Sequence, residues 1–160
     1  MVELLKTDVP AWNKWRKDNM GYIKIDLSGV NLRCTNLSRV NFIGANLNGA
    51  DLAWSNLYGA AFTGADLTDA NLFRADLSWA HLLWANLSCA GLNRAKLHRA
   101  NLERANLQRA DFECADLFCA NLKRANFGHT DLFCANLGLA DLEGAECHIA
   151  TFKNKETKNG

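Results

Sequence analysis

The sequence ANLERANLQR at residues 100–109 contains the pattern that decides the fold. From Ile25 to Asn154 the chain reads as 26 consecutive blocks of five residues without a gap. Leu occupies the third position in twenty blocks, Phe in five and Cys in one, whereas Ala occupies the first position in twenty and Asn or Asp the second in twenty. A repeat of this regularity determines the architecture, so it has to be read before any single motif.

A period of five residues fits neither a straight helix nor a straight strand. On a helix it turns each successive Leu by about 140° around the axis, and on a strand it places successive Leu side chains on opposite faces. Within one block, Ala and Leu are two residues apart, so an extended segment points both to the same side. The chain must therefore turn once per block. This predicts a solenoid whose coils pair with one another and whose interior is filled by Leu, Phe and Ala.

The turns of this solenoid cannot depend on glycine and proline, because the chain has only 11 Gly and one Pro. Asn and Asp at the second position point away from the interior, and their side chains can bond to nearby backbone at a corner. We expect them to supply the turn chemistry. Six glycines occupy the fifth position, which we interpret as a sign that no bulky side chain is required there: Gly29, Gly44, Gly49, Gly59, Gly64 and Gly144.

The consensus A-(D/N)-L-x-x resembles that of the pentapeptide-repeat family, over 130 of the 160 residues. The resemblance implies an all-β solenoid, a right-handed quadrilateral parallel β-helix with one block on each side and twenty residues per coil. Six and a half coils then extend over about 30 Å at the spacing of paired strands. We expect three segments, namely an N-terminal helical cap at 1–24, the β-helix at 25–154 and a polar tail at 155–160.

Residues 1–24 lie outside the repeats and predict a helical cap. Asp8 can cap a helix that has Pro10 in its first turn. We expect apolar residues of this segment to cover the first coil and charged ones to stay in solvent. The covering residues are Leu4, Leu5, Trp12 and Trp15, and the solvated ones are Lys14, Arg16, Lys17 and Asp18. The leader W-N-x-W-R-x-x-N at residues 12–19 is similar to the start of many bacterial members of the family, so we expect residue 1 to be the natural beginning of the protein.

The opposite end has no comparable cap in the sequence. The last repeats are expected to expose four apolar side chains at the end of the rod, namely Leu137, Leu142, Cys147 and Phe152. Unpaired strand edges invite pairing with another chain, and some members of the family dimerise. The sequence is compatible with a two-fold dimer through this end and with a frayed last coil over which the tail folds.

No arrangement of residues predicts catalysis or metal binding. The four histidines fall in four unrelated blocks, and a solenoid filled with Leu offers no cavity in which reacting groups converge. Cys114 and Cys134 stack one coil apart, within the Cα range of a disulfide, but six cysteines without an export signal indicate reduced thiols in a cytoplasm. The cysteine and histidine spacing is unlike that of zinc motifs. We therefore expect no enzymatic activity, no metal and no cofactor.

The fifth positions, read every twenty residues, predict a surface rich in Trp and Arg. Stacked Trp and Arg can form cation–π contacts, and both residue types are enriched in binding hot spots. We call this surface the Trp/Arg belt and predict that it binds a partner; it consists of Trp54, Arg74, Trp79, Trp84, Arg94, Arg99, Arg104 and Arg109. For each single residue the alternative is a solvated ladder that keeps the rod soluble.

The net charge of +1 hides zones of opposite sign, because residues 91–110 carry +4 and residues 111–146 carry −5. The best-known activity of the resembled family is mimicry of duplex DNA toward DNA gyrase, which needs continuous negative potential. The cationic zone interrupts such a potential, yet it offers no groove for nucleic acid, and no apolar run is long enough for a membrane span. The sequence favours a non-enzymatic, cytoplasmic protein–protein interaction module with an unidentified protein partner. The alternative is a DNA-mimic inhibitor or protector of DNA gyrase or another topoisomerase.

Overall fold

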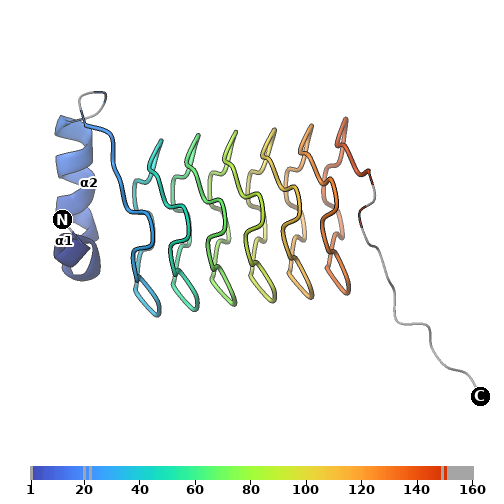
Figure 1. Cartoon of the computed structure of the whole chain (residues 1–160), viewed down its shortest axis with the longest axis horizontal. Coiled ribbons are helices and arrows are strands. Elements are labelled where there is room, and N and C mark those ends of the chain that lie inside the picture. Colours follow the sequence, from blue (N-terminus) through green and yellow to red (C-terminus); the bar gives the residue numbers. More distant parts are fainter. Residues whose placement is uncertain (1, 20, 22, 149, 151–160) are drawn as a thin grey trace, which may run out of the picture.

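The computed structural model describes residues 2–19, 21, 23–148 and 150. Two helices, α1 (Val2–Thr7) and α2 (Val9–Asp18), lie against one end of a row of stacked coils (Figure 1). The predicted tail at 155–160 and Phe152 lie outside the described residues.

The coils pair through isolated parallel bridges between residues twenty apart. The bridges run from Asp26↔Asn46 to Asn126↔Glu146, and each joins the second positions of two blocks. Pairing occurs one residue at a time because the chain turns again after every block. The described residues therefore form no continuous strand. One coil therefore takes twenty residues and contains four turns, which is the coil length that the family resemblance implies.

The backbone N–H groups of a block have regular partners. In the block at 100–104, the first N–H closes a turn onto the third carbonyl of the preceding block, at 2.9 Å. The N–H of the second residue donates to a carbonyl of the preceding coil. The N–H groups of the third and fifth residues donate to carbonyls of the following coil, and these three bonds measure 2.7–2.9 Å. The remaining N–H, that of Glu103, donates to Oδ1 of Asn101 at 3.1 Å. The predicted role of Asn and Asp at the turn is confirmed, since this acceptor recurs along the repeat.

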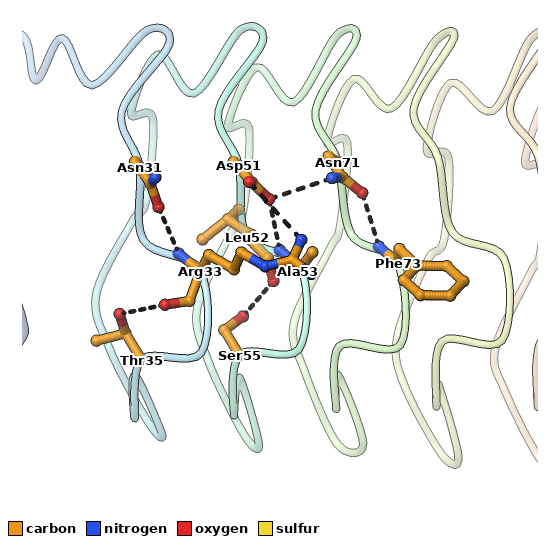
Figure 2. A network of polar contacts seen from close by, with 9 residues as sticks. All are labelled: Asn31, Arg33, Thr35, Asp51, Leu52, Ala53, Ser55, Asn71 and Phe73. Atoms are coloured by element: carbon orange, nitrogen blue, oxygen red, sulfur yellow. Dashed lines mark hydrogen bonds and ion pairs between the residues drawn. The ribbon is translucent and has the colours of Figure 1, made fainter.

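The polar contacts around Asp51 show the same arrangement in detail (Figure 2). Oδ1 of Asp51 accepts from the N–H of Ala53 at 3.0 Å and from Nδ2 of Asn71, one coil further on, at 3.1 Å. Ser55, which replaces the usual Ala, donates its hydroxyl to the carbonyl of Leu52 at 2.6 Å. A buried hydroxyl is thereby satisfied within its own turn.

The interior is a column of third-position and first-position side chains. The third-position Leu and Phe from Leu32 to Phe127 are at most 1% exposed, and so is nearly every first-position Ala of the same region. Four Phe fill the interior where Leu is replaced, and Phe42 contacts Phe62 with ring centroids 5.5 Å apart. The core assigned from the sequence is confirmed.

The fifth position has a left-handed backbone, which the sequence interpretation missed. From residue 29 to residue 144 every fifth-position residue has a positive φ, between 54° and 68°. The glycines there reflect this conformation rather than a mere tolerance of small side chains. A non-glycine residue in it costs about 1–2 kcal/mol. Arg, Trp and Cys at this position therefore destabilise the backbone relative to glycine.

The cap is packed as predicted, with one correction. Asp8 accepts from the N–H of Ala11 at 2.9 Å, and Leu5 and Trp12 are fully buried. Arg16, expected in solvent, is only 4% exposed. It lies four residues after Trp12 and therefore on the same helical face, from which its Nη2 reaches the carbonyl of Ile43 at 2.5 Å. The additional helix α1 was not predicted as a separate element.

Candidate partner-binding surface

Three Trp–Arg pairs of the predicted belt contact each other as the twenty-residue register implies. The guanidinium carbon of Arg74 lies 4.6 Å from the ring centroid of Trp54, and that of Arg99 lies 5.0 Å from Trp79. Arg104 stands 5.9 Å over Trp84. The three Trp side chains remain 44–56% exposed. Each pair thus presents an aromatic face and a cation to the surroundings, while its role in binding stays a prediction.

The belt surrounds the rod instead of forming one face. The four turns of a coil divide it into four sides, which we number from the blocks that begin at residues 25, 30, 35 and 40. The third side is bordered by two columns of fifth-position residues. These columns hold Trp54, Arg74 and Arg94 on one border, and Trp79 and Arg99 on the other. Trp84 and Arg104 lie at the turn from the fourth side to the first, and Arg109 at the turn from the first to the second, so one flat partner cannot contact all eight residues.

The third side carries further aromatic groups that the sequence interpretation did not single out. Tyr58 is 41% exposed and lies in the same coil as Trp54. The rings of His98 and Phe118 stack at 5.5 Å with an interplanar angle of 3°. Phe73, on the adjoining second side, packs edge-on against Trp54 with ring centroids 5.7 Å apart. These residues occupy fourth positions, and reading that register as well as the fifth would have found them.

Cations around the third side lack carboxylate partners within the described part of the chain. Elsewhere, Lys123 contacts Asp141 at 3.2 Å and Glu143 at 2.8 Å, and Arg33 and Arg104 each have a carboxylate at 3.9 Å. None of the ion pairs in that part of the chain includes the five cations that border or lie on the third side, namely Arg39, Arg74, Arg94, Lys96 and Arg99. This side therefore combines exposed aromatic rings with an excess of cations: Asp76 and Asp116 flank Lys96 in its column, but in the described part of the chain no carboxylate forms an ion pair with any of these cations.

The predicted apolar end is open as far as the structure describes it. Leu137 is partly buried, Leu142 is 38% exposed and Cys147 is exposed, in contrast to the fully buried third positions of earlier coils. Leu139, at a fifth position, is 78% exposed and was not predicted. These side chains leave an apolar surface at the end of the rod opposite the cap.

The carboxyl, ammonium and guanidinium groups whose pKa is shifted take part in structural contacts. The backbone N–H of Ser28 lowers the pKa of Asp26, and that of Glu143 lowers the pKa of Asp141. Hydrogen bonds to Glu143 and Asp141 raise the pKa of Lys123, and burial lowers the pKa of Arg16. Each of these groups is accounted for by a turn, an ion pair or the cap.

The hollows of the surface are shallow and carry no convergent chemistry. One open depression of about 570 Å³ lies between the cap and the first coil, lined by Thr7, Asp8, Asn13 and Arg39 among others. Among residues 2–19, 21, 23–148 and 150, no three His, Cys, Asp or Glu side chains gather as a metal site. In that same part of the chain, no helix has the length and apolar content that crossing a bilayer needs.

Together, the twenty-residue coils, the Asx-bonded turns and the capped end define a repeat protein built from stacked coils. The sequence model of the family described as pentapeptide repeats matches residues 24–57, 50–88, 85–118 and 120–154, in eight copies. This chain belongs to the pentapeptide repeat family. A search of curated protein sequences finds no significant match.

Solved structures of pentapeptide repeat proteins resemble the chain. HetL, involved in heterocyst differentiation regulation in the cyanobacterium Nostoc sp. strain PCC 7120, is 33% identical with a TM-score of 0.55, over 81% of this chain and 62% of HetL. A protein of the Arabidopsis thaliana thylakoid lumen is 31% identical with a TM-score of 0.47, over 63% of each chain. QnrB1, a plasmid-mediated fluoroquinolone resistance protein, is 20% identical with a TM-score of 0.48, over 82% of this chain and 80% of that one. The chain thus spans less than two thirds of the length of the first two.

Proposed function

We propose that this protein is a non-enzymatic interaction module, a stiff rod that binds another protein through its third side. We further infer that the coils form a right-handed quadrilateral parallel β-helix and that the protein works in the cytoplasm. The observation that carries the proposal is the combination of exposed Trp54, Tyr58 and Trp79 with five cations that form no ion pair with a carboxylate in the described structure. Trp, Tyr and Arg are the residue types that dominate binding hot spots.

The backbone conformation strengthens this proposal. Arg74, Arg94, Arg99 and both Trp residues of the third side's borders have φ between 55° and 61°, where glycine would avoid a cost of about 1–2 kcal/mol. Glycine occupies the same position in other blocks, such as Gly59 directly beneath Trp79. Large residues at a conformationally costly position indicate a use that the fold itself does not require.

The charge of the third side defines the chemistry of the partner. Positive potential beside exposed rings favours an acidic surface, because complementary potentials speed association and select among partners. The partner is therefore expected to present Asp or Glu next to apolar groups. HetL, which resembles this chain, is involved in heterocyst differentiation regulation, and a regulatory interaction is the corresponding role that we propose here.

Affinity capture from cells of the source organism, followed by mass spectrometry, tests the module directly. The bait is the full chain, and the comparison is a variant with Arg94, Arg99 and Arg104 replaced by Ser. We expect the variant to keep its fold, because all three side chains are on the surface, and to lose the captured partner. Unchanged capture by the variant contradicts a role for the Trp/Arg belt.

DNA mimicry toward gyrase is the competing function, and the charges do not favour it. The first side has acidic groups at Asp26, Asp66, Asp69 and Glu146, but Arg109 lies among them, and the third side is cationic at mid-length. A supercoiling assay with purified gyrase, repeated at two salt concentrations, distinguishes the functions. We expect no inhibition and no protection from a quinolone; a salt-sensitive effect on supercoiling at stoichiometric protein would instead favour the mimic.

A two-fold dimer through the open end is a further part of the proposal. Leu137, Leu142 and Leu139 provide apolar surface there, and unpaired backbone at a coil edge can add another chain. Light scattering over a range of concentrations should show a dimer that Leu142→Lys dissociates. A monomer at every concentration contradicts the dimer but leaves the proposal that a partner binds the third side untouched.

A further inference from the structure

Cys114 and Cys134 hold the same position in blocks that lie directly over one another. Their blocks are joined by the parallel bridge Asp111↔Asp131 and by the hydrogen bond from the N–H of Cys114 to the carbonyl of Phe133, at 2.8 Å. Both residues have nearly the same φ, 54° and 56°, so their side chains leave the backbone in the same direction. Both thiols are exposed.

The other fifth-position cysteines have no such neighbour in the described residues. Cys34 lies beneath Trp54, Cys89 has Arg109 as its neighbour in the next coil, and Cys119 lies between Arg99 and Leu139. Cys119 is close in sequence to Cys114 and occupies the next turn of the same coil. It therefore provides a matched control for a thiol in the same backbone environment without a stacked partner.

The groups around Cys114 disfavour its thiolate. Partial desolvation raises the pKa of Cys114, and the neighbouring Cys134 raises it further; Glu113 acts in the same direction and Arg94 opposes them. Thiolate formation, and with it the rate of exchange, is therefore expected to increase as the pH rises above neutral.

We propose that Cys114 and Cys134 form a reversible disulfide by exchange with a small diffusible disulfide, such as oxidised glutathione. One thiolate attacks a sulfur of the small disulfide, which forms a mixed disulfide and releases one small thiolate. The second protein thiolate then attacks the protein sulfur of the mixed disulfide and releases the other small thiolate. The protein pair loses two protons and two electrons, and the small disulfide becomes two thiols.

The geometry suits this bond with a small adjustment. The spacing of paired backbones, about 4.7–4.9 Å, lies within the Cα separations of disulfides, whereas the Cβ atoms must approach to about 3.8 Å. A local shift of about 1 Å at the two turns therefore closes the bond. Cys134 lies in the coil where burial begins to fail, since Leu137 is only partly buried, so the bond would hold that coil against the coil before it.

The experiment treats the full-length protein, at low concentration, with oxidised glutathione at neutral and mildly alkaline pH. Remaining thiols are alkylated, and the protein is digested without reduction for mass spectrometry. We expect two of the six thiols to be lost together, in a peptide pair that joins Cys114 to Cys134, faster at the higher pH. Added dithiothreitol should restore both thiols.

Two single variants separate the proposal from nonspecific oxidation. In Cys134→Ser, Cys114 should accumulate as the mixed disulfide with glutathione, because no second thiol can displace it. In Cys119→Ser the Cys114–Cys134 bridge should form as in the natural sequence. The proposal is overturned if the natural sequence carries separate glutathione adducts on Cys114 and Cys134, keeps both thiols free, or forms only bridges between molecules.

Discussion

The side chain of Asn13 in α2 accepts a hydrogen bond from the backbone N–H of Asn41, at 2.8 Å, and so takes the place of a missing coil. In the interior of the rod, the same N–H position donates to a carbonyl of the preceding coil. Trp12 and Arg16 act likewise, since they donate to the carbonyls of Asn41 and Ile43. The cap thus satisfies the backbone edge of the first coil as well as covering its apolar interior, which is what a solenoid end requires.

Removing the indole of Trp12 should open the first coil. Trp12 is fully buried, and its ring centroid lies 6.2 Å from that of Phe42. Its indole N–H donates to the carbonyl of Asn41 at 3.0 Å. Trp12→Ala is expected to cost roughly 3–5 kcal/mol, whereas Trp12→Phe keeps most of the buried ring and should cost less, through the lost hydrogen bond and the smaller ring. Amide hydrogen exchange at residues 40–44 measures the local effect. Equal protection in Trp12→Ala and the natural sequence contradicts the role of the cap.

The Asx turn predicts a difference between two substitutions of Asn101. Its Oδ1 accepts from the N–H of Glu103 and from Nδ2 of Asn121, both at 3.1 Å. Asn101→Ala removes both bonds and should lower the free energy of unfolding by about 1–3 kcal/mol. Asn101→Asp keeps the acceptor and should cost much less. Urea denaturation compares the two, and equal losses would show that the acceptor does not matter.

The left-handed fifth position predicts that alanine is tolerated at one glycine and not at another. A Cβ at Gly49 meets nothing within 4 Å, yet its φ is +64°, so Gly49→Ala should cost about 1–2 kcal/mol through the backbone alone. Gly91 has no positive φ and meets only a side-chain oxygen at 3.7 Å. Gly91→Ala should therefore be neutral or slightly stabilising. The midpoints of urea unfolding test this order, and a reversed order contradicts the account of the turn.

The stability of the rod should fall in acid. Backbone N–H groups lower the folded-state pKa of Asp26 and of Asp141 below the unfolded value. A carboxyl with a depressed pKa stabilises the fold above the ordinary Asp value of about 3.9, and this contribution is lost as the pH falls through the folded pKa. The double variant Asp26→Asn, Asp141→Asn keeps the turn acceptors without their titration. Thermal unfolding at pH 7 and near pH 3 should show a smaller acid loss in this variant; an identical loss contradicts the assignment.

The sequence predicts those features that a single block contains. The positions of Leu, Ala and Asn or Asp predict the core and the turn bonds, whereas the twenty-residue register, which places Arg74 over Trp54, comes from the resemblance to the pentapeptide-repeat family. Arg16 was misplaced because its burial depends on a carbonyl 27 residues away, at Ile43. The left-handed conformation was missed because Arg, Trp and Cys share that position with glycine, which obscures the usual glycine signal. Tyr58 occupies a fourth position, outside the fifth-position columns from which the Trp/Arg belt is predicted.

A capture experiment with two matched triple variants tests the central claim most directly, namely that a partner binds the third side. One variant replaces Arg74, Arg94 and Arg99, which border that side, by Ser; the other replaces Arg104, Arg109 and Arg124, which have the same left-handed position at other turns. Both remove the same charge, and both should fold. We expect the first variant to lose the partner that the natural sequence captures and the second to retain it. Equal capture by both variants, or loss only in the second, would contradict the claim.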